Sequence, residues 1–260
     1  MVERGDWDGA FIGIRTNSAD TSLTMVIGRS SAGGAGAFKG LGEDDTTYWI
    51  KPTNNHQSAF VPIAEQIVGR VGALIAAPVC TVRTIEIPQS LAGTLFSRNG
   101  GRLEPGLAHA SVNIKGSEQT YDLDYRNDDD NRRRHCGVHA LYDWCWGKDK
   151  QWLVAEDRSY HSHDHGAYLE PAILNSSTIE ALQELHQAHE LSNYYQSIGA
   201  SIADEVATRL EELSHEQIAK ALAEVPTSWL ISDNDLESIG FFLEYRAPQV
   251  ATRLRQNIVG

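Results

Sequence analysis

The sequence predicts an α+β fold with two lobes, a β-rich front and a helical back. Three observations lead to this prediction. Short β-branched and aromatic runs separated by turn residues fill most of the first third, and one amphipathic helical pattern interrupts them. Helical periodicity and helix-start signals then dominate the last third. A chain of 260 residues is long enough to build both lobes around a sizeable core.

The front lobe is expected to alternate strands with one helix. Strands are predicted at Met25–Arg29, Thr47–Lys51 and Val82–Ile87, because β-branched and aromatic side chains are frequent there. The small-residue stretch Ser30–Gly40 predicts a glycine-rich turn between the first two strands. Apolar residues at helical spacing predict a helix over residues 58–76.

We divide the lobes near Pro88, with residues 1–88 in the N-lobe and residues 89–260 in the C-lobe. The first part of the C-lobe carries weaker signals. Residues 89–115 have no clear pattern, and the charge-mixed run Tyr125–Cys136 is expected to be an exposed loop or the start of a helix.

A helical tail is predicted over residues 177–260. The capping boxes Ser177-x-x-Glu180 and Ser214-x-x-Gln217 each open an amphipathic stretch, and a third helix is expected near Ser232. One side of that third helix is predicted to carry Leu236, Ile239, Leu243 and Val250.

Composition and charge narrow the classes of function. The formal net charge of −13 repels a phosphate backbone and argues against direct nucleic-acid binding, although Mg²⁺ and one lysine suffice to neutralise ATP. Three cysteines without a CxxC pair favour a reducing compartment. The first residues lack the pattern of a secretory signal, and no run reaches about 18 apolar residues. We therefore expect a cytoplasmic protein that does not span a membrane.

Lys51 stands where a cation could meet a bound phosphate group. It ends a predicted strand that follows the glycine-rich turn, and phosphoryl transfer requires both a cation and backbone N–H groups near the phosphates. Glu65 lies on the flank of the predicted helix and could reach inward to pair with it. The ordinary alternatives are a strand-end lysine and a glutamate that both face water.

A predicted hairpin brings two carboxylates together. Trp152–Ala155 and Tyr160–His163 are expected to pair around Asp157 and Arg158, so that Ala155 faces Tyr160 and Trp152 faces His163. Gln151 then lies opposite Asp164, and Asp149 is one step beyond. Such a pair of aspartates suits phosphoryl transfer, in which one orients the attacking hydroxyl and the other binds Mg²⁺.

Histidines at alternate positions near the hairpin leave a second interpretation open. His161, His163 and His165 would share one face of an extended strand and could bind Zn²⁺. Because no cysteine lies nearby at ligand spacing, we favour histidines that are hydrogen-bonded beside the carboxylate.

Taken together, these segments resemble the HipA-like kinases, in the short form without a separate N-terminal domain. GEDDTTYWIKP and the helix after it imply that Lys51 contacts phosphate and that Glu65 is its pairing acid. LYDWCWGKDKQWLV resembles the family's catalytic loop, with Asp149 as the catalytic aspartate. SHDHGAYL resembles its metal-binding Asp-His-Gly, which falls on Asp164, and the helical tail is also similar.

The resemblance implies a kinase-like two-lobed fold with ATP and Mg²⁺ in the cleft. The nucleotide would contact Lys51, Glu65 and the glycine-rich turn, at Ser31, Gly33, Gly34 and Gly36.

Among the departures from the family pattern, one concerns a metal ligand. Val154 stands where the family's catalytic loop carries an asparagine that binds a second Mg²⁺. The nearest amide is that of Gln151, whose carbonyl oxygen could bind the ion in place of the asparagine. Gln151 and Asp164 both lie in the segment 143–168, which is expected to contain the catalytic loop and the metal-binding residues.

The resulting expectation is an ATP- and Mg²⁺-dependent phosphotransferase that modifies a serine or threonine hydroxyl of a protein. Two alternatives stay open: a pseudokinase that binds nucleotide and acts as an interaction partner, and a kinase for small molecules, with cationic acceptors favoured by the acidic chain. The family resemblance also makes an antitoxin-like protein a candidate partner.

Overall fold

The computed structural model describes residues 2–29, 36–55, 57–97, 100–120, 122, 124–148, 152–169 and 198–257. Its strands are β1 (Thr21–Arg29), β2 (Phe38–Gly42), β3 (Thr47–Lys51), β4 (Val82–Ile87), β5 (Gly106–Val112), β6 (Glu118–Thr120), β7 (Trp152–Val154) and β8 (Tyr160–Ser162). Its α-helices are α1 (Val61–Leu74), α2 (Asn131–Trp144), α5 (Ala200–Glu211), α6 (His215–Ala223) and α7 (Asp233–Asn257). Two short 3-10 helices are η1 (Arg4–Trp7) and η2 (Gln89–Leu91).

The first five strands close into a barrel in the order β1-β2-β3-β5-β4. Neighbours are antiparallel, except that β1 runs parallel to β4 and closes the ring. Apolar side chains from all five strands and from the β4–β5 loop fill the interior. Because side chains alternate along a strand, every second position of β3 faces outward, and Lys51 is one of these.

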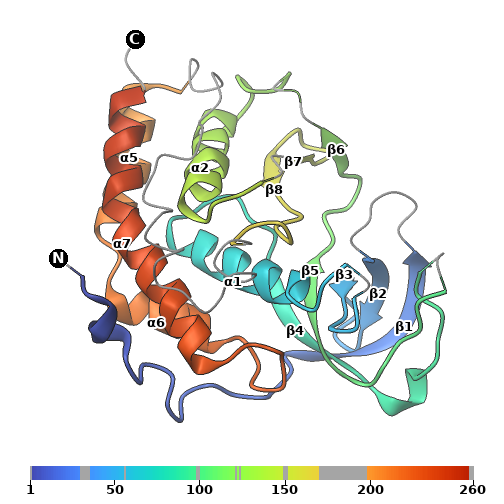
Figure 1. The fold of residues 1–260 in the computed structure, drawn as a ribbon. Helices are drawn as coiled ribbons and strands as arrows, with labels where there is room; N and C mark the ends of the chain where they lie inside the picture. The colour runs from blue at the N-terminus through green and yellow to red at the C-terminus, as the bar shows by residue number, and fades with distance from the viewer. Residues whose placement is uncertain are drawn as a thin grey trace.

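Helix α1 lies between the barrel and the C-terminal helices (Figure 1). It contacts β4 and β5 on one side and α6 on the other. Its apolar side chains belong to the same core as those of α2, α5, α6 and α7. Trp7 of η1 also enters this core, where it packs on the backbone of α7 at Gly240. Helix α1 therefore ties the barrel to the helical part of the molecule.

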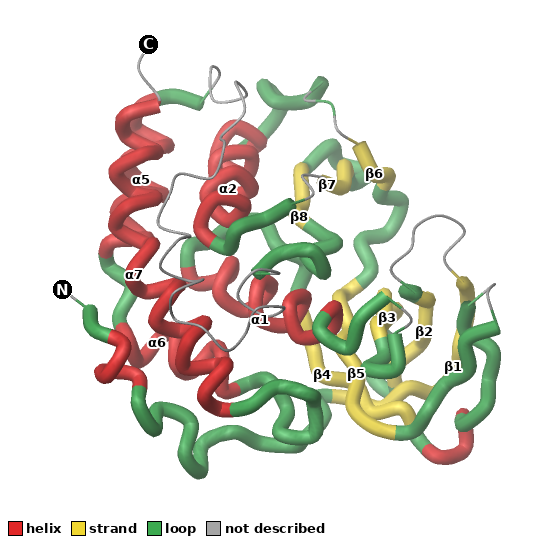
Figure 2. The backbone as a smooth tube through the Cα atoms, in the orientation of Figure 1, coloured by secondary structure: helices red, strands yellow, loops and turns green. Residues whose placement is uncertain are grey.

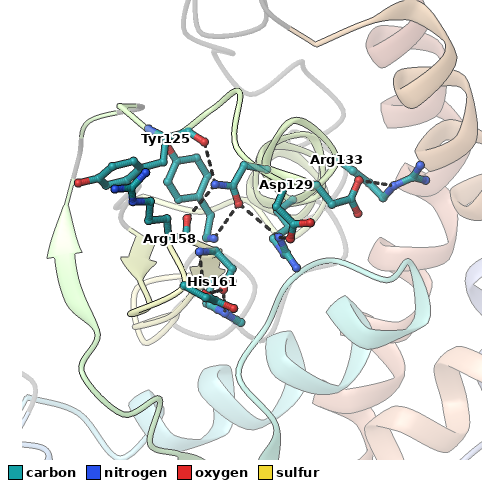
Figure 3. A network of polar contacts seen from close by, with 11 residues as sticks. Tyr125, Asp129, Arg133, Arg158 and His161 are labelled. Carbon is teal, nitrogen blue, oxygen red and sulfur yellow. Dashed lines mark hydrogen bonds and ion pairs between the residues drawn. The ribbon is translucent and has the colours of Figure 1, made fainter.

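A small second sheet, β6-β7-β8, lies beside α2 (Figure 2). All of its pairings are antiparallel. A buried side chain, Asn131, joins the sheet to the start of α2: its amide donates to the carbonyls of Tyr125 and Arg158, and its oxygen accepts from the backbone N–H of Tyr160. Figure 3 shows this network at the turn between β7 and β8, with Tyr125 and Arg158 on one side and Asp129 and Arg133 on the other.

The predicted register of the β7–β8 hairpin is wrong by one residue. Val154, not Ala155, pairs with Tyr160, and Trp152 pairs with Ser162. The N–H of Ala155 also donates to the carbonyl of Ser159, so the turn itself contains three residues, and the last of them, Arg158, has a left-handed φ of 67°. A three-residue turn of this kind is the usual alternative to a two-residue turn. Here Asp157 favours it, because its carboxylate accepts bonds from both the backbone and the side chain of Ser159.

Several elements agree with the sequence prediction. Strands β3 and β4 have the predicted bounds, and α1 lies within the predicted range. The capping box at Ser214 is present, while the one at Ser177 lies outside the described residues. The four apolar side chains predicted on one side of α7 are all buried in the helical core. In the described part of the chain, no helix is long and apolar enough to cross a membrane.

Strand β5 was not predicted. It lies between β3 and β4, with the barrel interior on one face and α1 on the other. Its inward positions are Ala108 and Ala110, and its helix-facing position is the buried His109. Small and polar residues on a strand covered on both faces carry neither an alternating nor a continuous apolar signal.

Candidate active site

Lys51 lies at the centre of the site, at the end of β3. Its ammonium donates a short hydrogen bond to Oε1 of Glu65 on α1 and another to Oδ1 of Asp164, at 2.5 Å. The side chains of Lys51 and Glu65 are only 9% and 6% exposed, whereas that of Asp164 is 39% exposed. The barrel, α1 and the segment after β8 thus meet at one cation, and only the Asp164 carboxylate opens to solvent.

Glu65 is held from a second side by His165. Its Oε2 lies 3.7 Å from Nδ1 of His165, whose Nε2 is 2.8 Å from the hydroxyl of Ser162 at the end of β8. Both histidine and serine are buried. These contacts fix the carboxylate of Glu65 relative to Ser162 and His165, which lie before and after Asp164 in the sequence.

A second buried histidine, His109, lies on β5 next to Lys51. His109 faces Lys51 across the β3–β5 ladder, and its Nδ1 is 3.0 Å from Oε1 of Gln66. The amide nitrogen of Gln66 in turn lies 3.4 Å from the hydroxyl of Thr84 on β4. These polar contacts join α1 to two strands of the barrel.

Burial and charge act in opposite directions on the ion pair. Burial alone would lower the pKa of Lys51, but attraction by Glu65 and Asp164 prevails and raises it to about 12. Burial alone would raise the pKa of Glu65, but Lys51 and the two histidines hold it well below its usual range. Burial lowers the pKa of His165 to about 4 and that of His109 to about 3. At neutral pH the site therefore contains a charged pair flanked by neutral imidazoles.

The backbone at Asp164 is unusual. Its φ is 56°, in the left-handed region that aspartate enters more readily than most residues. Two residues later, Gly166 packs against α1, where an added Cβ would lie 2.8 Å from Cγ1 of Val61. The glycine thus lets the segment approach α1 closely enough for Asp164 to reach Lys51.

Comparisons with known proteins identify the family of this chain. Residues 23–161, more than half of the 260 residues, match the family model described as HipA-like kinase. The chain belongs to the HipA-like kinase family. No curated protein matches the sequence at a significant level.

A solved structure shares the fold of this HipA-like kinase. The crystal structure of the Helicobacter pylori proinflammatory kinase CtkA matches with a TM-score of 0.58 and 13% identity, over 92% of this chain and 99% of that one. The Golgi casein kinase with Mn/ADP bound matches with a TM-score of 0.41 and 12% identity, over 98% of this chain and 77% of that one. The likeness to CtkA shows a mixed α+β kinase-like fold, in which the barrel precedes the helical part.

Not every predicted site residue lies in the described part of this kinase. Asp149 and Gln151 lie outside it, as do Ser31, Gly33 and Gly34. The described flanks of Asp149 are the end of α2 and the start of β7. Gly36 is described, has a left-handed φ of 58° and leads into β2. Val154 pairs with Tyr160 inside the small sheet.

The histidines do not share one strand face. Strand β8 ends at Ser162, so only His161 of the three is in it. His161 contacts the hydroxyl of Ser159 at 2.9 Å, whereas His165 is buried next to Glu65. No cluster of three or more His, Cys, Asp or Glu side chains able to bind a metal occurs within the described ranges. Sequence reasoning missed His109, because β5 carries no pattern that would place it. Gln66 and Thr84 lie on predicted elements, but their contacts depend on how α1 packs against the barrel.

Proposed function

We propose that this kinase transfers the γ-phosphoryl group of ATP, with Mg²⁺, to a serine or threonine hydroxyl of a protein. The observation that carries the proposal is the contact of buried Lys51 with both Glu65 and Asp164. A lysine ammonium has three donors. Two of them meet these carboxylates among the described residues, and the third is available to a phosphate oxygen.

Each residue then has a distinct role. Lys51 neutralises phosphate charge, and Glu65 keeps its ammonium at the end of β3. Asp149 orients the acceptor hydroxyl and accepts its proton. The backbone of the turn that includes Ser31, Gly33, Gly34 and Gly36 approaches the phosphates.

The donor set near Lys51 fits a magnesium ion. Mg²⁺ is commonly bound through one or two carboxylates together with substrate phosphates, and the partly exposed Asp164 offers such a carboxylate. Gln151 would supply a further oxygen in place of the family's asparagine. Bound there, the ion would neutralise charge on the transferred group.

Phosphoryl transfer from γ-labelled ATP tests the proposal. Wild type should label itself or an added protein, and Asp149→Ala and Asp164→Ala should each reduce labelling by at least about 100-fold. Asp204→Ala, which removes an exposed aspartate on α5, is the matched control and should label like wild type. Labelling that persists in both site variants would contradict the assignment of Asp149 and Asp164.

The acceptor needs a separate experiment. The panel should contain proteins and small hydroxylated amines, because a pocket of about 380 Å³ beside β6 and β7 is lined by Glu118, Asp122, Asp124 and Glu156. Transfer only to the small molecules would replace the protein acceptor with a small-molecule one. Thermal stabilisation by ATP without any transfer would indicate a pseudokinase.

A further inference from the structure

The end of α2, which leads toward Asp149, has an uncommon geometry. The N–H of Gly147 donates to the carbonyl of Tyr142 at 2.8 Å, and that of Trp146 donates to the carbonyl of Asp143 at 3.3 Å. These two bonds form a Schellman motif, whose left-handed residue is usually glycine. Here that residue is Trp146, with a φ of 51°. A left-handed non-glycine residue costs roughly 1–2 kcal/mol, so the turn requires support from its surroundings.

Arg246 of α7 contacts this turn, although it lies about a hundred positions further along the chain. Its guanidinium donates to the carbonyl of Asp143 at 2.6 Å and to that of Trp144 at 3.3 Å. It also lies over the ring of Trp146, 5.1 Å from the centroid. The Arg246 side chain is 0% exposed. A cation bonded to the last carbonyls of a helix is favourably placed with respect to the helix dipole.

Arg253, one further α7 arginine, offers a built-in comparison. It donates to both oxygens of the Asp143 carboxylate, at 2.7 and 2.9 Å. Arg246 binds the same carboxylate at 2.7 Å. The Asp143 side chain is 1% exposed, so both arginines contribute to a buried ion cluster. Of these two arginines, Arg246 also contacts the helix-end carbonyls and Trp146 in the described part of the chain.

We propose that Arg246 is a positioning residue for the catalytic loop, because it holds the left-handed turn at Trp146, three residues before Asp149 in the sequence. The inference rests on the proposed function, since it assigns Asp149 to the reaction. The guanidinium of Arg246 stays charged at neutral pH, because burial lowers its pKa only to about 10. Nucleotide binding by Lys51, Glu65 and Asp164 does not involve Arg246, so the two effects are separable.

Steady-state kinetics on Arg246→Met, Arg246→Lys and Arg253→Met test this role. A displacement of about 1 Å at a reacting group can reduce the rate by about 100-fold. We therefore expect Arg246→Met to lower kcat by about 10- to 100-fold and to leave KM for ATP within about twofold of wild type. Arg246→Lys retains a cation but cannot stack its charge as a planar group on Trp146, and its kcat should be intermediate.

Arg253→Met is the matched control for damage to the ion cluster. It should lower Tm, because it removes two bonds to the buried Asp143 carboxylate, while kcat stays near that of wild type. Equal kcat values for all three variants and wild type, or equal losses in Arg253→Met and Arg246→Met, would overturn the inference. If Arg246→Met does not fold, the comparison of Arg246→Lys with Arg253→Met decides in the same way. Absence of transfer by wild type would instead overturn the proposed function, and the inference with it.

Discussion

The ion pair between Lys51 and Glu65 can be tested by removing one charge at a time. Glu65→Gln keeps the shape of the side chain but removes the carboxylate that contacts the buried ammonium. Breaking a buried ion pair costs about 3–5 kcal/mol, because the remaining charge loses its compensation. Asp164 still contacts Lys51, so we expect a loss near the lower limit, about 3 kcal/mol in the free energy of unfolding.

A double variant separates the ion pair from general damage. Lys51→Met should cost a similar amount, since it leaves the buried Glu65 without its ammonium. In Lys51→Met with Glu65→Leu, both charges are gone and apolar groups fill the site, so stability should return to within about 1–2 kcal/mol of wild type. Such a double variant should remain inactive, because no cation is left to meet the phosphates.

Urea unfolding followed by circular dichroism gives the required free energies. Glu86→Gln on β4 is the control, because this glutamate is exposed, and it should change stability by less than about 0.5 kcal/mol. A loss below about 1 kcal/mol for Glu65→Gln, with additive effects in the double variant, would refute the role of this pair in joining β3 to α1.

Three further predictions concern residues around the site. Because the folded pKa of His109 is depressed to about 3, the unfolded state takes up its proton first as the pH falls below 6.5, and stability should decline there by up to about 1.4 kcal/mol per pH unit. His109→Gln should flatten this part of the urea-derived profile, and an unchanged slope would exclude His109 as its source. Gly166→Ala places a methyl group against Val61, so we expect about 1–3 kcal/mol of destabilisation by thermal unfolding together with a lower rate of phosphoryl transfer; a variant as stable as wild type would contradict the close packing. Asn131→Ala leaves the buried N–H of Tyr160 without the acceptor it has in the structure, which should cost about 1–3 kcal/mol in chemical unfolding, and a change below about 0.5 kcal/mol would show that the bond is replaced.

The elements that could be predicted are those whose side chains follow one period. Thr47–Lys51 reads as a strand because β-branched and aromatic side chains dominate it, and α7 reads as a helix because its apolar side faces one core. Strand β5 could not be predicted, since its pattern depends on two neighbouring strands and a helix that the local sequence does not specify. The predicted register of the β7–β8 hairpin was wrong because of a single residue: the left-handed Arg158 lengthens the turn and shifts the strand pairs by one position.

The geometry of the site residues likewise depends on tertiary packing that the local sequence does not specify. From the sequence alone, Glu65 could either face water or point inward to pair with Lys51. Its burial depends on how α1 packs between the barrel and the helices. The left-handed backbone at Asp164 and the support of Trp146 by Arg246 are tertiary features as well. Residues a hundred or more positions apart make the contacts at Asp164 and Trp146, so no local window of the sequence contains them.

The packing of α1 also predicts how firmly the Lys51–Glu65 pair is held. Ile63, Ile67 and Val71 of α1 are fully buried in the helical core. Burying such a side chain contributes about 1.5–3 kcal/mol, so moving α1 away from the core would cost roughly 5–9 kcal/mol for these three alone. That cost is comparable to the whole stability of a typical domain, about 5–15 kcal/mol. Displacement of α1 is then nearly equivalent to global unfolding.

Native-state hydrogen exchange measures whether α1 leaves the core without global unfolding. In the nucleotide-free protein, the central amides of α1 should exchange as slowly as those of α7 and with the same dependence on urea, because both helices are released only when the shared core opens. Amides of α1 that exchange much faster than those of α7 would mean that α1 leaves the core on its own. Glu65 would then be a movable partner of Lys51, and nucleotide would have to assemble the site. Equal protection means that Lys51 and Glu65 are already in contact before nucleotide binds, so nucleotide affinity does not have to provide the free energy for bringing α1 to the barrel.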